Sequence, residues 1–134
     1  MNLGTTLAEL DTALAAITGL RHIPYPDASV NAPQITLTLP DSIAFDETYR
    51  RGSDRLTLMA VLTVSMTDPR TGFASLLEYC AGSGAKSVKQ AIEAGTYTQA
   101  ADVRVATCDF DVYTFSGVPY YAAVFSIDIV GSGI

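Results

Sequence analysis

The sequence contains few of the residues that most often carry chemistry. It has no tryptophan, one histidine and two cysteines, and only 16% of its 134 residues are charged, against roughly a quarter in an average soluble domain. No apolar run approaches the roughly twenty residues that a membrane-spanning helix requires. The N-terminus has neither the basic nor the apolar stretch of a secretory signal. We therefore expect no export signal and no membrane partner.

Positive charge is also scarce. Lysine and arginine number 8 against 14 aspartates and glutamates, so the net charge is -6. This balance excludes a sequence-independent nucleic-acid binder, which needs a basic face to neutralise phosphates. The mean hydropathy of +0.26 is high for so lightly charged a chain. Such a composition predicts that part of the surface is hidden against other chains.

The length predicts one domain, residues 1–134, that can bury a core without disulfides. We find no repeat, low-complexity segment or domain linker. Cys80 and Cys108 fall in a predicted helix and a predicted strand. In a chain without an export signal we expect them to be free thiols that pack as small hydrophobic residues.

The strongest structural signal lies between Asp54 and Met66. Successive side chains of a strand point to opposite faces, and this stretch alternates strictly between apolar and mixed positions. It therefore predicts a long central strand with one wholly apolar face. The apolar face would carry Leu56, Leu58, Ala60, Leu62, Val64 and Met66.

A helix is predicted at the N-terminus. Apolar residues recur at spacings of three and four between Leu3 and Ile17, which is the stripe of an amphipathic helix. Asn2 and Thr6 are alternative N-caps. Gly19 stands where a left-handed C-terminal cap is expected.

Three segments connect this helix to the central strand. Residues 21–33 contain several prolines, which predicts an extended, turn-rich connection. Residues 34–39 alternate and predict a short strand with one buried face. Residues 41–53 are predicted to form a long loop. Long loops in compact domains are usually functional or ordered by a partner.

Two helices and a hairpin are predicted after the central strand. The first helix starts at Asp68-Pro69, and the second starts at Ser87 and closes at Gly95. Residues 103–115 and 120–130 form a hairpin around the turn at 116–119. The helical period of the first of these helices runs through Phe73, Leu76, Leu77 and Cys80. The order α-β-β-α-β-β predicts an α+β fold, in which helices pack on one face of an antiparallel sheet of about four strands.

The side chains suited to acid-base or metal chemistry do not form a recognisable constellation. His22 has no cysteine, aspartate or glutamate at ligand spacing, which favours a structural role. Asp109 and Asp111 share one side of a predicted strand, and Asp128 lies on the next strand. Together they could bind a hard cation, but solvent-facing positions explain them equally well. We expect no catalytic residue, metal or cofactor, and a non-enzymatic protein.

The pair Arg50 and Arg51 has two interpretations. In one of them, both side chains are solvated beside a turn. In the other, a rigid guanidinium fork reaches an acidic patch on a neighbouring copy or on another component of the same assembly, because identical copies in a ring contact each other through two different surfaces.

The order of these segments resembles a family. The leucine-striped helix and proline-rich link are followed by the loop Tyr49-Arg50-Arg51-Gly52-Ser53-Asp54 and the long strand. Then come the helix around Leu76-Leu77-Glu78-Tyr79, the helix start Ser87-Val88-Lys89-Gln90-Ala91-Ile92 and the final hairpin. Over nearly its whole length the chain resembles the tail terminator (tail completion) proteins of siphovirus-type bacteriophages, particularly those that infect actinobacteria.

The resemblance implies a structural protein of the virion, assembled in the bacterial cytoplasm and located at the head–tail junction. It implies a ring, expected to be a hexamer, that caps the tail tube and ends its polymerisation. The partners would be other copies, the major tail tube protein and the head–tail connector. We expect the interface to include Phe45, Tyr49, Arg50, Arg51, Gly52 and Asp54. Asp109, Asp111 and Asp128 would line an acidic channel through which DNA passes without binding.

Two alternatives remain. A head completion or head–tail adaptor protein of the same phage type can share this small α+β layout. A small α+β enzyme or ligand-binding domain would need a pocket that holds His22 or the aspartates.

Overall fold

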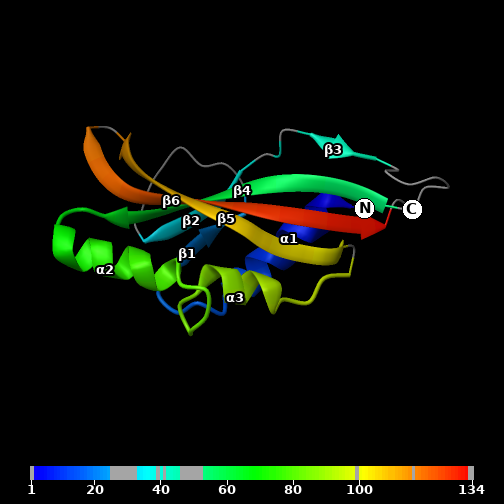
Figure 1. Cartoon of the computed structure of the whole chain (residues 1–134), viewed down its shortest axis with the longest axis horizontal. Helices are drawn as coiled ribbons and strands as arrows, with labels where there is room; N and C mark the ends of the chain where they lie inside the picture. Colours follow the sequence, from blue (N-terminus) through cyan, green and yellow to red (C-terminus); the bar gives the residue numbers. More distant parts are fainter. Residues whose placement is uncertain are drawn as a thin grey trace.

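The computed structural model describes residues 2–24, 33–38, 40, 42–45, 53–98, 100–115 and 117–132. Over these residues the chain is an α+β fold of three helices and one six-stranded sheet (Figure 1). In chain order the elements are α1 (Leu3–Leu14), β1 (Arg21–Ile23), β2 (Gln34–Leu37), β3 (Ile43–Ala44), β4 (Ser53–Ser65), α2 (Pro69–Tyr79), α3 (Val88–Glu93), β5 (Ala100–Phe115) and β6 (Val118–Ser132).

The sheet is mixed rather than wholly antiparallel. Its order is β1-β2-β4-β6-β5, and β3 pairs with β4 as well. Strands β1 and β2 are parallel, and the other pairs are antiparallel. The prediction of about four antiparallel strands in the order α-β-β-α-β-β was wrong in these details. It missed β1 in the proline-rich connection and β3 in the predicted loop, because three and two residues are too short to show alternation.

Strand β4 occupies the centre of the sheet, as its sequence predicts. One edge pairs with β6 along the whole strand, from Ser53 opposite Ser132 to Ser65 opposite Tyr120. The other edge pairs with β2 and, nearer the start of β4, with β3. The final hairpin is also confirmed, with Gly117 at φ +79° in the turn between β5 and β6.

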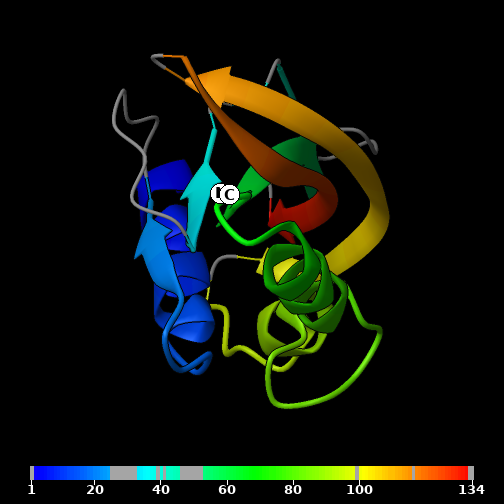
Figure 2. The same cartoon turned by 90° about the vertical axis from the view of Figure 1, so that its left-hand side faces the viewer.

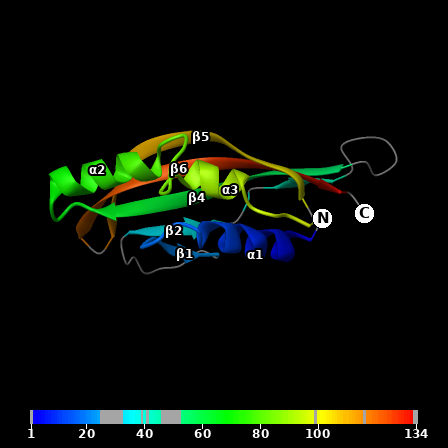
Figure 3. The ribbon, with the colours of Figure 1, turned by 90° about the horizontal axis from the view of Figure 1, so that it is seen from below.

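The three helices lie on one side of a strongly twisted sheet (Figures 2 and 3). The apolar face of β4 points toward them and is buried, and the corresponding face of β6 joins it. Burying a leucine, isoleucine or phenylalanine side chain stabilises a fold by about 2 kcal/mol, so this face contributes strongly to the core. The largest fully buried side chains are Phe125, Leu10, Leu14, Ile35, Leu37, Leu58, Leu62, Ile92, Ile127, Ile129, Val88 and Thr6. We call the helix-free side of the sheet the open face.

Side-chain caps begin each helix. The Oδ1 atom of Asn2 accepts a hydrogen bond from the Thr5 amide at 3.1 Å, so Asn2 is the N-cap of α1, and Thr6 lies inside the helix. The predicted caps of α2 and α3, Asp68 and Ser87, are confirmed. Hydrogen bonds from Thr71 lower the pKa of Asp68, because they favour its charged form.

The C-terminal end predicted for the first helix, at Gly19, was wrong. Helix α1 stops at Leu14 with Ala15 as its C-cap, and Gly19 turns the chain further on, at φ +83°. Ser87 and Gln90 form only half of a capping box. The Gln90 amide donates to the Ser87 hydroxyl at 3.1 Å, but the Gln90 side chain accepts from the Gly84 amide instead of the Ser87 amide.

Helix α2 packs closely on the end of β4 through a glycine. A Cβ atom built on Gly72 would lie 2.2 Å from the Ser65 carbonyl oxygen, a distance that real Cβ atoms do not show. Gly72, Leu76 and Tyr79 form the buried side of the helix. Phe73 and Leu77, which the helical period suggested for the core, are instead 52% and 48% exposed.

We predict that Gly72→Ala destabilises the protein although alanine favours helices. The helix-propensity gain is at most about 1 kcal/mol. Displacing a backbone carbonyl costs more, so we expect a net loss of about 2 kcal/mol in urea unfolding. Gly4→Ala in α1 is the matched control, because its Cβ would meet only Asn2 Oδ1 at 3.4 Å. Equal unfolding midpoints for the two variants would contradict the close approach of α2 to β4.

Candidate functional site

The residues predicted for an interface divide into three groups. Tyr49, Arg50, Arg51 and Gly52 lie outside the described residues. Phe45 follows β3 and is 67% exposed, so its ring is available to a partner. Asp54, near the start of β4, is only 3% exposed and opposes Gly131 of β6. Within a single copy the Asp54 side chain therefore lies below the surface.

The three aspartates predicted for a channel all lie on the open face. Asp109 and Asp111 of β5 oppose Val124 and Ala122 of β6, four or more residues away from Asp128 along that strand. Four strand residues span about 13 Å, so Asp128 does not converge with the other two. Among the described residues no group of three or more histidines, cysteines, aspartates or glutamates is placed to hold a metal ion.

Asp128 belongs to a polar row that crosses three strands. It opposes Thr57 of β4 on one side and Arg104 of β5 on the other. The Thr57 hydroxyl donates to its Oδ1 at 3.0 Å. This row and Arg55 border a depression of about 330 Å³ on the open face, whose lining residues are Arg55, Thr57, Asp102, Arg104, Asp128 and Val130.

A second depression of about 400 Å³ lies where β2 and β3 meet β4. Its lining residues are Thr38, Pro40, Ser42, Ala44, Arg55, Leu56, Thr57 and Met59. Arg55 and Thr57 border both depressions, which lie side by side. This part of the open face offers hydroxyls and charges of both signs, which suit polar contacts with a partner surface.

His22 is part of a structural pair. Its Nδ1 atom lies 2.5 Å from an oxygen of Asp11, which joins β1 to α1. Sequence inspection missed this partner because Asp11 belongs to another element. No described hydroxyl or thiol is bonded to His22, whereas a nucleophile activated by a histidine needs that contact.

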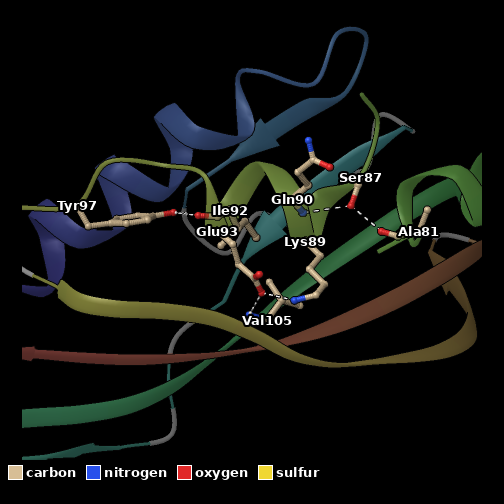
Figure 4. Close-up of polar contacts among 8 residues, drawn as sticks. All are labelled: Ala81, Ser87, Lys89, Gln90, Ile92, Glu93, Tyr97 and Val105. Atoms are coloured by element: carbon tan, nitrogen blue, oxygen red, sulfur yellow. Dashed lines mark hydrogen bonds and ion pairs between the residues drawn. The ribbon is translucent and has the colours of Figure 1, made fainter. Parts of the chain in front are cut away.

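Strand β5 forms one edge of the sheet, and helix α3 covers its first half. The Glu93 carboxylate accepts a hydrogen bond from the Val105 amide at 3.1 Å and pairs with Lys89 (Figure 4). The pKa of Glu93 is lowered, chiefly by the hydrogen bond from Lys89. The Tyr97 hydroxyl holds the end of α3 by donating to the Ile92 carbonyl (Figure 4).

The second half of β5 has no such cover. A register shift follows Val105, and no described strand pairs with the outer edge beyond it. Within this half the Val112 amide is bonded to the side chain of Asp111, at 2.7 Å. An unpaired strand edge presents amides and carbonyls to which another chain can bind. We call residues 108–112 of β5, which pair with no described strand on their outer side, the free edge.

Apolar side chains are exposed beside the free edge. Phe110 and Val112 are 59% and 51% exposed and lie on the helix side of the sheet, opposite Ala123 and Tyr121. On α2, the Phe73 ring meets the Tyr121 ring edge-on at a centroid distance of 6.2 Å. Exposed apolar residues of this size, when they gather, mark interaction sites. We call Phe73, Leu77, Phe110 and Val112 the apolar patch.

Sequence inspection did not single out the apolar patch. Phe110 and Val112 alternate with Asp109 and Asp111, which correctly indicates a strand with one apolar side. However, alternation does not say whether a helix covers that side. Here Gly72, Leu76 and Tyr79 form the buried side of α2, which packs on β4 and β6, so the described helices leave the end of β5 uncovered.

Comparison with known proteins adds no family: no protein-family model and no curated protein sequence matches the chain. Among the helices of the described residues, none is long and apolar enough to cross a membrane. The surfaces described above are therefore the basis for assigning a function.

We predict that Glu93→Ala loosens the start of the β5 edge. The variant should lose about 1 kcal/mol of stability at pH 7, and the Val105 amide should exchange its hydrogen several times faster. Glu78→Ala is the matched control, because Glu78 pairs with Lys86 at the surface and its variant should change stability by less than about 0.5 kcal/mol.

The difference in stability between the Glu93→Ala and Glu78→Ala variants depends on pH. Because the folded pKa of Glu93 is lowered from 4.5, its contribution is present above about pH 4.5 and is lost as the pH falls through the folded value. Urea unfolding at pH 7 and pH 3 measures this loss. A Glu93→Ala deficit that persists undiminished at pH 3 would show that the carboxylate charge is not responsible.

Proposed function

We propose that the chain is a tail terminator protein of a siphovirus-type bacteriophage, a structural subunit whose copies close into a ring on the end of the tail tube. The layout of the sequence is the first support for this function. The observation that carries it is the free edge of β5 with the apolar patch beside it. A monomeric domain commonly covers such an edge along its whole length, whereas an assembling subunit pairs it.

The free edge and the apolar patch together suit one kind of contact. A partner segment in extended conformation can bond to the backbone between Cys108 and Val112 while its apolar side chains meet Phe110 and Val112. Leu77 and Phe73 of α2 would border that segment on its helix side. The contact combines directional hydrogen bonds with apolar burial, which gives both register and affinity.

A ring also needs a second, different surface on each copy. Copies related by a rotation that closes contact each other head to tail, so two unlike patches must meet. Met59 of β4 and Phe45, which follows β3, supply exposed apolar side chains. Strand β6 separates β4 and β3 from β5, so the two surfaces face different neighbours.

The open face suits a passage for DNA in this assembly. It carries Asp102, Asp109, Asp111 and Asp128 against Arg55 and Arg104. A face with this acidic excess repels phosphates, so DNA would pass a lumen built from it without adhering.

The decisive experiment is electron microscopy of particles made by the parent phage when this gene is disrupted. Overlong, headless tails are the expected result, because nothing would stop tube growth. Tails of normal length beside unjoined heads would overturn the proposal in favour of a head–tail adaptor. Intact infectious particles would overturn both assignments.

We further predict that Phe110→Glu abolishes complementation of the disrupted gene. A charge at this exposed position should change folding stability by no more than about 0.5 kcal/mol but place an unpaired carboxylate in the contact. We expect infectious titres at least about tenfold lower than with the wild-type chain. Thr107→Glu, on the open face of the same strand, is the matched control. Equal titres from the two variants, with equal thermal unfolding midpoints, would exclude the apolar patch as a contact.

A further inference from the structure

The two cysteines meet in the folded chain. Cys80 and Cys108 are both free thiols, as the sequence predicts, and each is half-buried. Their Sγ atoms lie 3.6 Å apart. A disulfide has its sulfurs about 2.05 Å apart, so the two atoms need to approach by only about 1.5 Å.

We propose that Cys80 and Cys108 are a covalent modification site, at which a low-molecular-weight disulfide oxidises them to an internal disulfide that locks α2 to the edge strand β5. The inference rests on the geometry of the pair and does not depend on the proposed role in a phage tail.

The backbone at both cysteines permits the approach. Cys80 is the C-cap of α2, with φ -92° and ψ 2°, so its side chain can shift without breaking a helical turn. Its amide stays bonded to the Leu76 carbonyl at 3.0 Å, which keeps the cap in place. Cys108 lies opposite Phe125 on a strand that is held by β6 along one edge only.

The position of the pair gives the bond a structural effect. Two of the points at which helix α2 meets the sheet are Phe73 against Tyr121 and Cys80 against Cys108. Leu77 lies between these points on the helix, and Phe110 lies between Cys108 and Val112 on the strand. A covalent link at one of the two points fixes the helix side and the strand side of the apolar patch relative to each other.

The oxidation proceeds by thiol–disulfide exchange with oxidised glutathione. The thiolate of one cysteine attacks a glutathione sulfur, forms a mixed disulfide and releases one reduced glutathione. The second thiolate then attacks the protein sulfur of the mixed disulfide and releases the other. Two protein thiols lose two electrons, and one glutathione disulfide gains them and takes up the two protons.

The surroundings of the pair make this exchange slow at neutral pH. Burial, together with the neighbouring Cys108, raises the pKa of Cys80 to about 12. Burial and the charge of Asp109 raise the pKa of Cys108, although the hydrogen bond with Cys80 opposes this. Only the thiolate attacks, so the pair stays reduced on short exposure and reacts faster as the pH rises.

The test treats the full-length native chain with excess oxidised glutathione at pH 7, 8 and 9. We expect both thiols to become inaccessible to alkylation together, in a monomer lighter by two hydrogens. The rate should rise about tenfold per pH unit. The thermal midpoint should rise by about 5 °C or more and return to its starting value after reduction with dithiothreitol.

Cys80→Ser and Cys108→Ser are the matched controls. Each should stop at a single glutathione adduct with no gain in thermal midpoint. The proposal is overturned if the wild-type chain accumulates two glutathione adducts or disulfide-linked dimers. It is also overturned if the internal bond forms without a rise in the thermal midpoint, because the bond would then lock nothing. None of these outcomes alters the electron microscopy test of ring function.

Discussion

The backbone pairing of β4 is the constraint on which the rest of the structure depends. Its thirteen residues are bonded along the whole length to β6 and, on the other edge, to β2 and β3. This pairing fixes which side chains point to each face, because a shift of one residue would exchange the faces completely. The three helices then pack against the apolar side chains, on one side of the sheet. The polar side chains remain on the open face.

The same pairing determines where the sheet can bind other chains. With β4 and β6 in the interior, β5 becomes an edge strand of sixteen residues, longer than the helices can cover. Helix α3 protects the first half through Glu93, whose carboxylate accepts a hydrogen bond from the Val105 amide. The second half pairs with no described strand along its outer edge and exposes Phe110 and Val112. One half of this edge is therefore protected by a helix, and the other half is exposed.

The candidate site was only partly predictable from the sequence. Alternation placed Asp109 and Asp111 on one side of β5 correctly, because strand geometry alone decides this. It did not reveal that Asp128 lies in a row with Thr57 and Arg104, since strand register depends on distant residues. The pairing of His22 with Asp11 and the contact between the two cysteines were invisible for the same reason. Phe73 and Leu77 were expected in the core, but the close approach of α2 at Gly72 turned them outward.

By itself the sequence determined the local structure: the alternation of β4, the hairpin of β5 and β6, and the caps at Asp68 and Ser87. Each of these arises from interactions between residues close together in the chain, so a short stretch contains all the information. Tertiary structure alone decided the mixed sheet, the short strands β1 and β3, and the exposure of the apolar patch. These features depend on which distant segments pack together. Burial, unlike periodicity, is a property of the whole fold.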